Sequence, residues 1–124
     1  MRVVLADDHE VLRKGVKALL EGHSQWTVCG EAGNGQEAVD LVVQLQPELI
    51  VLDLSMPIMN GLRAAAKIRR LSPATKIVIL SIHDSPHIKR EALDAGADAF
   101  VTKSAAGAEL IQTIDALFSG ISHP

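Results

Sequence analysis

The sequence predicts an α/β fold in which a parallel β-sheet carries helices on both faces. Five short apolar runs alternate with segments whose apolar residues recur at helical spacing. Three of the five runs are continuously apolar, as strands covered on both faces should be. Strands that alternate with helical segments are typical of parallel sheets, so these observations favour one doubly wound sheet.

The predicted strands also indicate their order in the sheet. In chain order they are "RVVLA" (2–6), "WTVCGEA" (26–32), "LIVL" (49–52), "KIVILS" (76–81) and "AFVT" (99–102). The second run contains Thr27, Gly30 and Glu31, which suits an edge strand, and the short fifth run suits the other edge. The three continuously apolar runs then occupy the centre. This arrangement matches the flavodoxin-like order 2-1-3-4-5 of a (βα)5 fold.

Five amphipathic segments are predicted to be helices. Three of them present one apolar face each, formed by Leu12, Val16 and Leu19, by Ala38, Val42 and Leu45, and by Leu110, Ile114 and Leu117. The other two helices are predicted over 61–71 and 87–95.

Several residues suit the boundaries of these helices. Asn34 and Asn60 are predicted N-caps, and Pro86 suits a first helical position. Gly96 suits a C-terminal cap, and the tail 119–124 is expected to fray.

Length and composition predict a single globular domain over residues 1–124. No apolar run approaches the roughly 20 residues that a membrane helix needs, so we expect no membrane partner. One cysteine, Cys29, cannot form an internal disulfide; we interpret it as a buried inert thiol and expect a cytoplasmic protein. The net charge is −3 and the basic residues are spread over separate helices, which argues against direct nucleic-acid binding by this chain.

Polar residues stand at the ends of four predicted strands. Asp7 and Asp8 follow the first strand, Asp53 the third, and Lys103 the fifth, while Ser81 ends the fourth. In an open parallel sheet, ligands bind beyond the carboxyl ends of the strands, where the strand order reverses. We therefore expect these five residues to lie at one edge of the sheet.

Three carboxylates at this edge predict a bound cation. Unit charges ~4 Å apart interact by about 4 kcal/mol at an effective dielectric constant of 20, and Lys103 offsets only one carboxylate. Oxygen ligands without a nearby cysteine favour a hard ion, and Mg²⁺ commonly combines carboxylates, waters and a phosphate. Asp7 and Asp8 would hold Mg²⁺ directly and through water, and the backbone carbonyl of Ser55 would add a ligand.

A cation that recruits phosphate beside a further carboxylate favours phosphoryl transfer through an aspartyl phosphate. Asp53 is the predicted nucleophile, because it lies between the acidic pair on one side and Ser81 and Lys103 on the other. Lys103 would neutralise phosphoryl oxygens, and the Ser81 hydroxyl would donate a hydrogen bond to one of them.

Four stretches carry a resemblance to a known family: "LADDHEVLRKG", "LIVLDLSMPIMNG", "VILSIHDS" and "EALDAGADAFVTKS". Over nearly its whole length the chain resembles the receiver domain of two-component response regulators. It is most similar to the NarL/FixJ (LuxR-type) branch, whose members usually carry a C-terminal helix-turn-helix domain. An acidic pair or a serine alone is weak evidence, but all five elements in order at strand ends are specific.

The resemblance implies that Asp53 accepts a phosphoryl group from the phosphohistidine of a sensor histidine kinase. The implied Mg²⁺ ligands are Asp7, Asp8, Asp53 and the carbonyl of Ser55. Such a domain catalyses its own phosphorylation and dephosphorylation and turns over no external substrate. Transcription regulation would then follow from a DNA-binding domain outside this chain.

The resemblance also implies a switch. Ser81 corresponds to the hydroxyl switch residue of the family and Phe100 to its aromatic switch residue. Phosphorylation would draw Ser81 toward the phosphate and let Phe100 turn inward, which reshapes the face around the fourth helix and the fifth strand. A homodimer through the first and fifth helices, or through the fourth-helix face, is expected on the same basis.

Three positions depart from the pattern of the family. Ser104 follows Lys103 where the family often has a cis proline; a non-proline cis bond costs ~2.5–4 kcal/mol, so we expect a trans bond. Ile82 stands where a small residue is usual and is expected to narrow access to the phosphoryl site. Phe100 replaces the common tyrosine and lacks its hydroxyl.

Simpler interpretations of single residues remain open at this point. Asp8 alone would be read as a cap of the first helix, and Asp53 as a turn residue. Lys103 alone would be a solvated lysine, Ser81 a turn hydroxyl and Phe100 a packing residue. The five histidines have no metal-ligand spacing and are interpreted as surface residues, among which His83 would adjust hydrolysis of the phosphoaspartate.

Other functions also remain open. The chain is either half of a transcription factor or a stand-alone receiver that acts as a phosphorelay or protein-contact module. A Mg²⁺-dependent aspartyl-phosphate phosphatase of the haloacid dehalogenase type would carry Asp-x-Asp, but His9 stands at the second position. A flavodoxin needs a phosphate-cradling loop after the first strand, where Asp7 and Asp8 would repel the phosphate.

Overall fold

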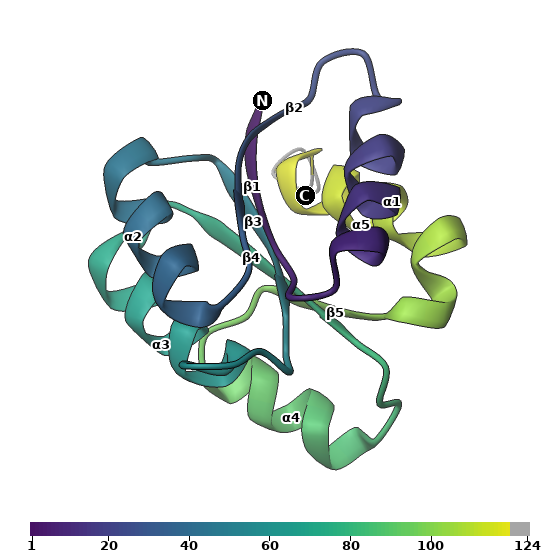
Figure 1. The fold of residues 1–124 in the computed structure, drawn as a ribbon. Coiled ribbons are helices and arrows are strands. Elements are labelled where there is room, and N and C mark those ends of the chain that lie inside the picture. Colours follow the sequence, from purple (N-terminus) through teal and green to yellow (C-terminus); the bar gives the residue numbers. More distant parts are fainter. Residues whose placement is uncertain (120–124) are drawn as a thin grey trace.

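The computed structural model describes residues 1–119 as one parallel five-stranded sheet with five α-helices (Figure 1). The strand order is β2-β1-β3-β4-β5, which confirms the predicted flavodoxin-like topology. The strands are β1 (Arg2–Ala6), β2 (Thr27–Ala32), β3 (Leu49–Asp53), β4 (Lys76–Ser81) and β5 (Ala99–Thr102). The helices are α1 (Glu10–Glu21), α2 (Gly35–Leu45), α3 (Gly61–Leu71), α4 (Pro86–Asp94) and α5 (Ala106–Ser119). The end of the tail expected to fray, together with His123, lies outside the described residues.

The helices form two layers, one on each face of the sheet (Figure 1). In β3, Ile50 and Leu52 pack in a core beneath α2, α3 and α4, whereas Leu49 and Val51 pack in a second core with α1 and α5. Alternate residues of a strand point to opposite faces, so a strand covered on both sides must be apolar throughout. This explains why the central strands β1, β3 and β4 read as unbroken apolar runs. The two remaining strands, β2 and β5, lie at the edges of the sheet.

The four predicted boundary residues all stand at the helix ends for which the sequence predicts them. Asn34 accepts a hydrogen bond from the amide of Glu37 at 2.9 Å, and Asn60 caps α3 in the same way at 3.0 Å. Pro86 is the first residue of α4. Gly96 directly follows the C-cap residue of α4 with φ = +115°, and its amide donates to the carbonyl of Leu93 at 3.1 Å, so it closes the C-terminal end of the helix as predicted.

The interpretation of Asp8 as the cap of the first helix is wrong. His9 is the N-cap residue of α1, and its own side chain makes no capping hydrogen bond. At the start of the last helix, a 3₁₀ turn over Lys103–Ala105 separates β5 from α5, and the Lys103–Ser104 bond is trans as expected. Cys29 has a free thiol and is half-buried against the core beneath α2, not fully buried.

The start of α3 approaches the end of β3 closely. The amide of Gly61 donates to the carbonyl of Leu54 at 2.8 Å. A Cβ atom at Gly61 would meet the backbone oxygen of Asp53 and would lie 2.8 Å from the Cα atom of Leu54. Because these neighbours are backbone atoms, they cannot move aside without displacing Asp53.

We therefore expect Gly61→Ala to destabilise the fold by about 1–3 kcal/mol, since it overpacks the junction of β3 and α3. Gly107→Ala is the matched control, because a Cβ at Gly107 meets nothing within 4 Å and alanine favours a helix. Urea denaturation of the two variants and the parent chain measures both effects. Equal stabilities of the two variants would contradict the overpacking argument.

Candidate functional site

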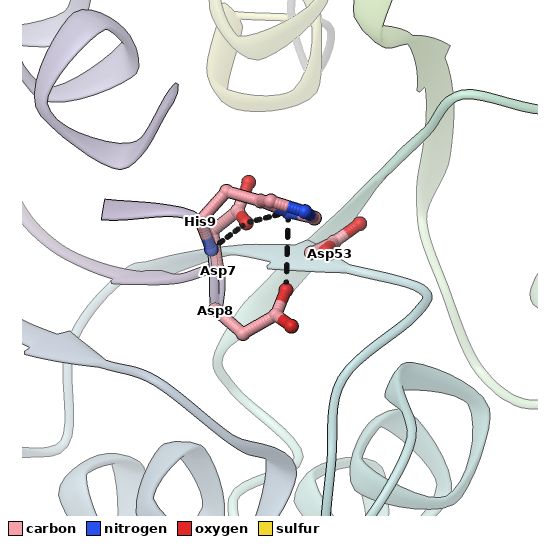
Figure 2. A group of neighbouring side chains, drawn as sticks. All are labelled: Asp7, Asp8, His9 and Asp53. Atoms are coloured by element: carbon pink, nitrogen blue, oxygen red, sulfur yellow. Dashed lines mark hydrogen bonds and ion pairs between the residues drawn. The ribbon is translucent and has the colours of Figure 1, made fainter. Parts of the chain in front are cut away.

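The predicted site residues from four strands lie at one edge of the sheet. Asp53 is the last residue of β3, Ser81 the last of β4, and Asp7 follows β1 directly. Lys103 begins the 3₁₀ turn after β5. Figure 2 shows Asp7, Asp8, His9 and Asp53 gathered beyond the strand ends.

Lys103 joins the two buried carboxylates. Its Nζ atom lies 3.1 Å from Oδ2 of Asp7 and 3.2 Å from Oδ1 of Asp53. Asp7 is 2% exposed and Asp53 is 3% exposed, so both carboxylates are withdrawn from water. The Lys103–Ser104 peptide bond is trans, and with this geometry the ammonium group of Lys103 reaches both carboxylates.

Two carboxylates, those of Asp7 and Asp53, and one ammonium group, that of Lys103, leave an excess of negative charge. Burial, followed by the charge of Asp7, raises the pKa of Asp53 above its ordinary value, and Lys103 offsets only part of this rise. Burial alone would lower the pKa of Lys103, but the attraction of Asp53 and Asp7 outweighs it and raises that pKa. Lys103 therefore stays charged at neutral pH, while the ionised form of Asp53 is disfavoured.

Arg13 fixes the backbone at the start of the site, a role that the sequence did not reveal. Its guanidinium donates to the backbone carbonyl of Asp7 at 2.7 Å and to Glu31 of β2 at 3.1 Å. Lys17 also contacts Glu31 at 3.2 Å. Burial acts to raise the pKa of Glu31, but the hydrogen bonds from Lys17 and Arg13 lower it overall. Glu31 is thus an ionised anchor for Arg13.

The donor set fits a divalent cation. Asp7, Asp8, His9 and Asp53 each offer one donor atom, and these atoms lie within 4.8 Å of one another. Among the described residues, Oδ2 of Asp53 accepts no hydrogen bond, and Oδ2 of Asp7 has only the ion pair with Lys103. A buried oxygen without a partner is costly, and a bound cation would satisfy it. Carboxylate oxygens are ligands that suit Mg²⁺.

The remaining predicted residues surround this cluster. The Ser81 hydroxyl is buried and accepts a hydrogen bond from the amide of His83 at 3.0 Å. Ser55 and His83 line an open groove of about 600 Å³ that reaches Asp8. Phe100 of β5 is half-buried against the core beneath α4.

Two histidines depart from their interpretation as plain surface residues. His9 is exposed, but its Nδ1 atom lies 3.2 Å from Asp8 and 3.4 Å from Asp7. Its position directly after the acidic pair is the signal that could have placed it in the site. His23 is half-buried, because its ring stacks on Trp26 with centroids 3.9 Å apart.

A family model, the response regulator receiver domain, matches residues 3–115. The chain belongs to this family. The receiver is 39% identical to the transcriptional regulatory protein YdfI of Bacillus subtilis over 96% of its own length and 55% of that protein. It is 38% identical to the nitrate/nitrite response regulator NarL of Escherichia coli, over 95% of the chain and 55% of that protein.

A solved structure agrees with these sequence comparisons. The receiver domain of the putative response regulator NarL from Mycobacterium tuberculosis superposes with a TM-score of 0.90 at 34% identity, over 96% of each chain. These relatives place the receiver in the NarL/LuxR branch. The chain spans about half the length of the curated relatives it matches. Within the described residues, no helix is long and apolar enough to cross a membrane.

The raised pKa of Asp53 predicts how the free energy of unfolding depends on pH. Between the ordinary value of 3.8 and its raised pKa, Asp53 is protonated in the folded protein but ionised in the unfolded chain, so stability falls as the pH rises through that window. We expect Asp53→Asn to increase the free energy of unfolding at pH 7, without divalent cations, by on the order of 1 kcal/mol. The gain should shrink toward pH 3.8.

Urea denaturation at pH values from about 3.5, near the ordinary carboxyl pKa, to about 8 measures this difference. Asp40→Asn is the control, because Asp40 is exposed on α2 and lies outside the cluster. A variant Asp53→Asn that is less stable than the parent at pH 7 would show that the ion pair with Lys103 outweighs burial and repulsion.

Proposed function

We propose that residues 1–124 form one receiver domain that accepts a phosphoryl group on Asp53 and converts it into a change of its protein-interaction face. The observation that carries this proposal is the placement of Asp53. Its carboxylate is buried at the end of β3, contacts Lys103, and keeps one oxygen without a hydrogen bond among the described residues. A strand end that carries such a costly group is consistent with a reactive role.

The proposed donor is the phosphohistidine of a sensor histidine kinase. A carboxylate oxygen of Asp53 attacks phosphorus, and the new O–P bond forms as the P–N bond breaks. The electron pair of that bond stays on the imidazole nitrogen of the donor. Lys103 holds the phosphoryl oxygens through its ammonium group, and the Ser81 hydroxyl donates a hydrogen bond to one of them.

The proposed metal ligands are Asp7, Asp8, Asp53 and the backbone carbonyl of Ser55. Bound Mg²⁺ would supply positive charge between the carboxylates and the phosphoryl oxygens, which lowers their mutual repulsion. The protein's own contribution is to fix these donors before the phosphoryl group arrives. Arg13 and the amide of His9 hold Asp7 in place for this purpose.

The proposed switch links Ser81 to Phe100. The Ser81 hydroxyl now accepts from the amide of His83, and a phosphoryl group on Asp53 gives it a stronger acceptor. Phe100 pairs in register with Ile79, two residues before Ser81 on the neighbouring strand β4. Movement of Ser81 therefore opens space beside Phe100, and the ring turns inward and changes the α4–β5 face.

The longer relatives suggest how this face is used. YdfI is a transcriptional regulatory protein, and the receiver aligns with about half of it. We propose that the face controls a C-terminal DNA-binding domain, in a cytoplasmic protein that forms a homodimer through α1 and α5 or through α4. The alternative is a stand-alone receiver that acts in a phosphorelay through protein contacts. In both cases the domain is a signalling module without an external substrate to turn over.

Incubation with acetyl phosphate and Mg²⁺ tests the acceptor. We expect intact-mass spectrometry to show the addition of one phosphoryl group, absent in Asp53→Asn and retained in Asp40→Asn. Lys103→Gln should slow the labelling at least about tenfold, because it removes the charge beside the phosphoryl oxygens. Labelling that survives in Asp53→Asn would contradict the assignment, and turnover of many phosphate esters without labelling would favour a phosphatase.

The switch has a separate test. The chain has two phenylalanines, so the ring of Phe118 serves as an internal reference for the ring of Phe100 in NMR spectra. Beryllofluoride and Mg²⁺ should shift the Phe100 ring resonances in the parent chain and in Ser104→Ala, but much less in Ser81→Ala. An equal shift in Ser81→Ala would show that the Phe100 ring responds independently of the Ser81 hydroxyl, and it would contradict the proposed switch.

A further inference from the structure

The acidic cluster contains a nitrogen donor. Nδ1 of His9 lies 3.2 Å from Oδ1 of Asp8 and 3.4 Å from Oδ1 of Asp7, and Figure 2 shows the imidazole beside these carboxylates. His9, Asp7, Asp8 and Asp53 are the described residues whose donor atoms lie within 4.8 Å of one another. The metal ligands proposed above are all oxygen atoms, so they leave the imidazole unexplained.

The cluster contains a buried carboxylate oxygen that Lys103 does not satisfy. Oδ2 of Asp53 accepts no hydrogen bond among the described residues, although this side chain is more than nine-tenths buried, whereas Oδ2 of Asp7 has its ion pair with Lys103. Asp53 and Asp7 belong to the same group of possible metal ligands as His9. A carboxylate with an unsatisfied oxygen and the imidazole are therefore members of one group of possible ligands.

The spacing of the donors suits a shared ion. Adjacent ligands of an octahedral ion at ~2.1 Å lie about 3.0 Å apart, by the geometry of a right angle. The distances from His9 Nδ1 to Asp8 and Asp7 exceed this value by a few tenths of an ångström. Small adjustments of two χ angles would bring the imidazole into the coordination shell, because the side chain of His9 is 64% exposed and little packing opposes its rotation. Its backbone is held by the hydrogen bond of its amide to Asp7.

We propose that Nδ1 of His9 is a direct ligand of the divalent cation at this site, so that the receiver favours Mn²⁺ and Ni²⁺ over Mg²⁺ more than an all-oxygen site would. The inference rests on the proposed function, which puts the cation between Asp7, Asp8 and Asp53. Imidazole nitrogen suits transition metals, whereas Mg²⁺ prefers oxygen and keeps its waters. Available manganese or nickel would then compete with magnesium for control of the domain.

Calorimetric titration of the 124-residue chain, prepared without a histidine tag, measures this preference with Mg²⁺, Mn²⁺ and Ni²⁺. We expect His9→Gln to weaken Mn²⁺ and Ni²⁺ binding about tenfold or more and to change Mg²⁺ binding little. His83→Gln is the matched control, because His83 is an exposed histidine that lines the groove beside Asp8. It should leave all three affinities unchanged.

Pulsed electron paramagnetic resonance of bound Mn²⁺ tests the bond itself. An imidazole ligand gives a nitrogen hyperfine coupling, which we expect in the parent chain and in His83→Gln but not in His9→Gln. Absence of this coupling from the parent chain would overturn the proposal, and it would leave His9 as a hydrogen-bond donor to Asp8. Loss of the coupling in His83→Gln alone would assign the nitrogen to His83 and overturn it as well.

Labelling of Asp53 by acetyl phosphate keeps this inference separate from the proposed function. Labelled Asp53 without nitrogen coordination overturns the role of His9 and leaves the phosphoryl acceptor intact. Nitrogen coordination without labelled Asp53 supports the role of His9 and overturns the acceptor. The amide NMR spectrum of His9→Gln shows whether the variant is folded, and we expect it to be, because the exposed side chain of His9 makes no cap bond to α1.

Discussion

The rest of the structure depends on one electrostatic constraint. Asp7 and Asp53 repel each other, and a single ammonium group, that of Lys103, pairs with both carboxylates. Two carboxylates are withdrawn from water beside Lys103, whose side chain is 14% exposed, and a lone buried charge would cost several kcal/mol. The remaining structure must hold the three groups at ion-pair distance against their tendency to separate. The hydrogen bonds of Asp7 with Arg13 and with the amide of His9 serve that end.

The doubly wound sheet supplies the rigidity that this arrangement needs. β1 and β3 are neighbours although they are not consecutive, because the chain crosses from the edge strand β2 to the far side of β1. This reversal of strand order sets the end of β1 beside the end of β3, with packed helices on both faces. The close approach of Gly61 to the end of β3 holds the third strand to α3. The backbone on each side of the acidic cluster therefore has little room to relax.

The sequence predicted the topology and the convergence at the sheet edge, because both follow from local patterns. Continuous apolar runs mark strands covered on two faces, and polar residues at strand ends meet wherever parallel strands end. It did not predict the contact of Arg13 with the backbone of Asp7, since that bond joins a helix to a loop through Glu31 on another strand. The place of His9 and the stacking of His23 on Trp26 depend on side-chain direction, which periodicity does not encode.

The link from Arg13 to Glu31 also ties the acidic cluster to the outermost strand. β2 pairs with β1 alone, and an edge strand with one neighbour opens locally at a lower free energy than the central strands do. When β2 opens, Glu31 leaves Arg13, and the guanidinium that bonds the carbonyl of Asp7 loses its carboxylate partner. Amide exchange at the sheet margin and the order of the carboxylates are thus thermodynamically linked, so fraying of the edge strand removes one of the contacts that keep the cluster ordered.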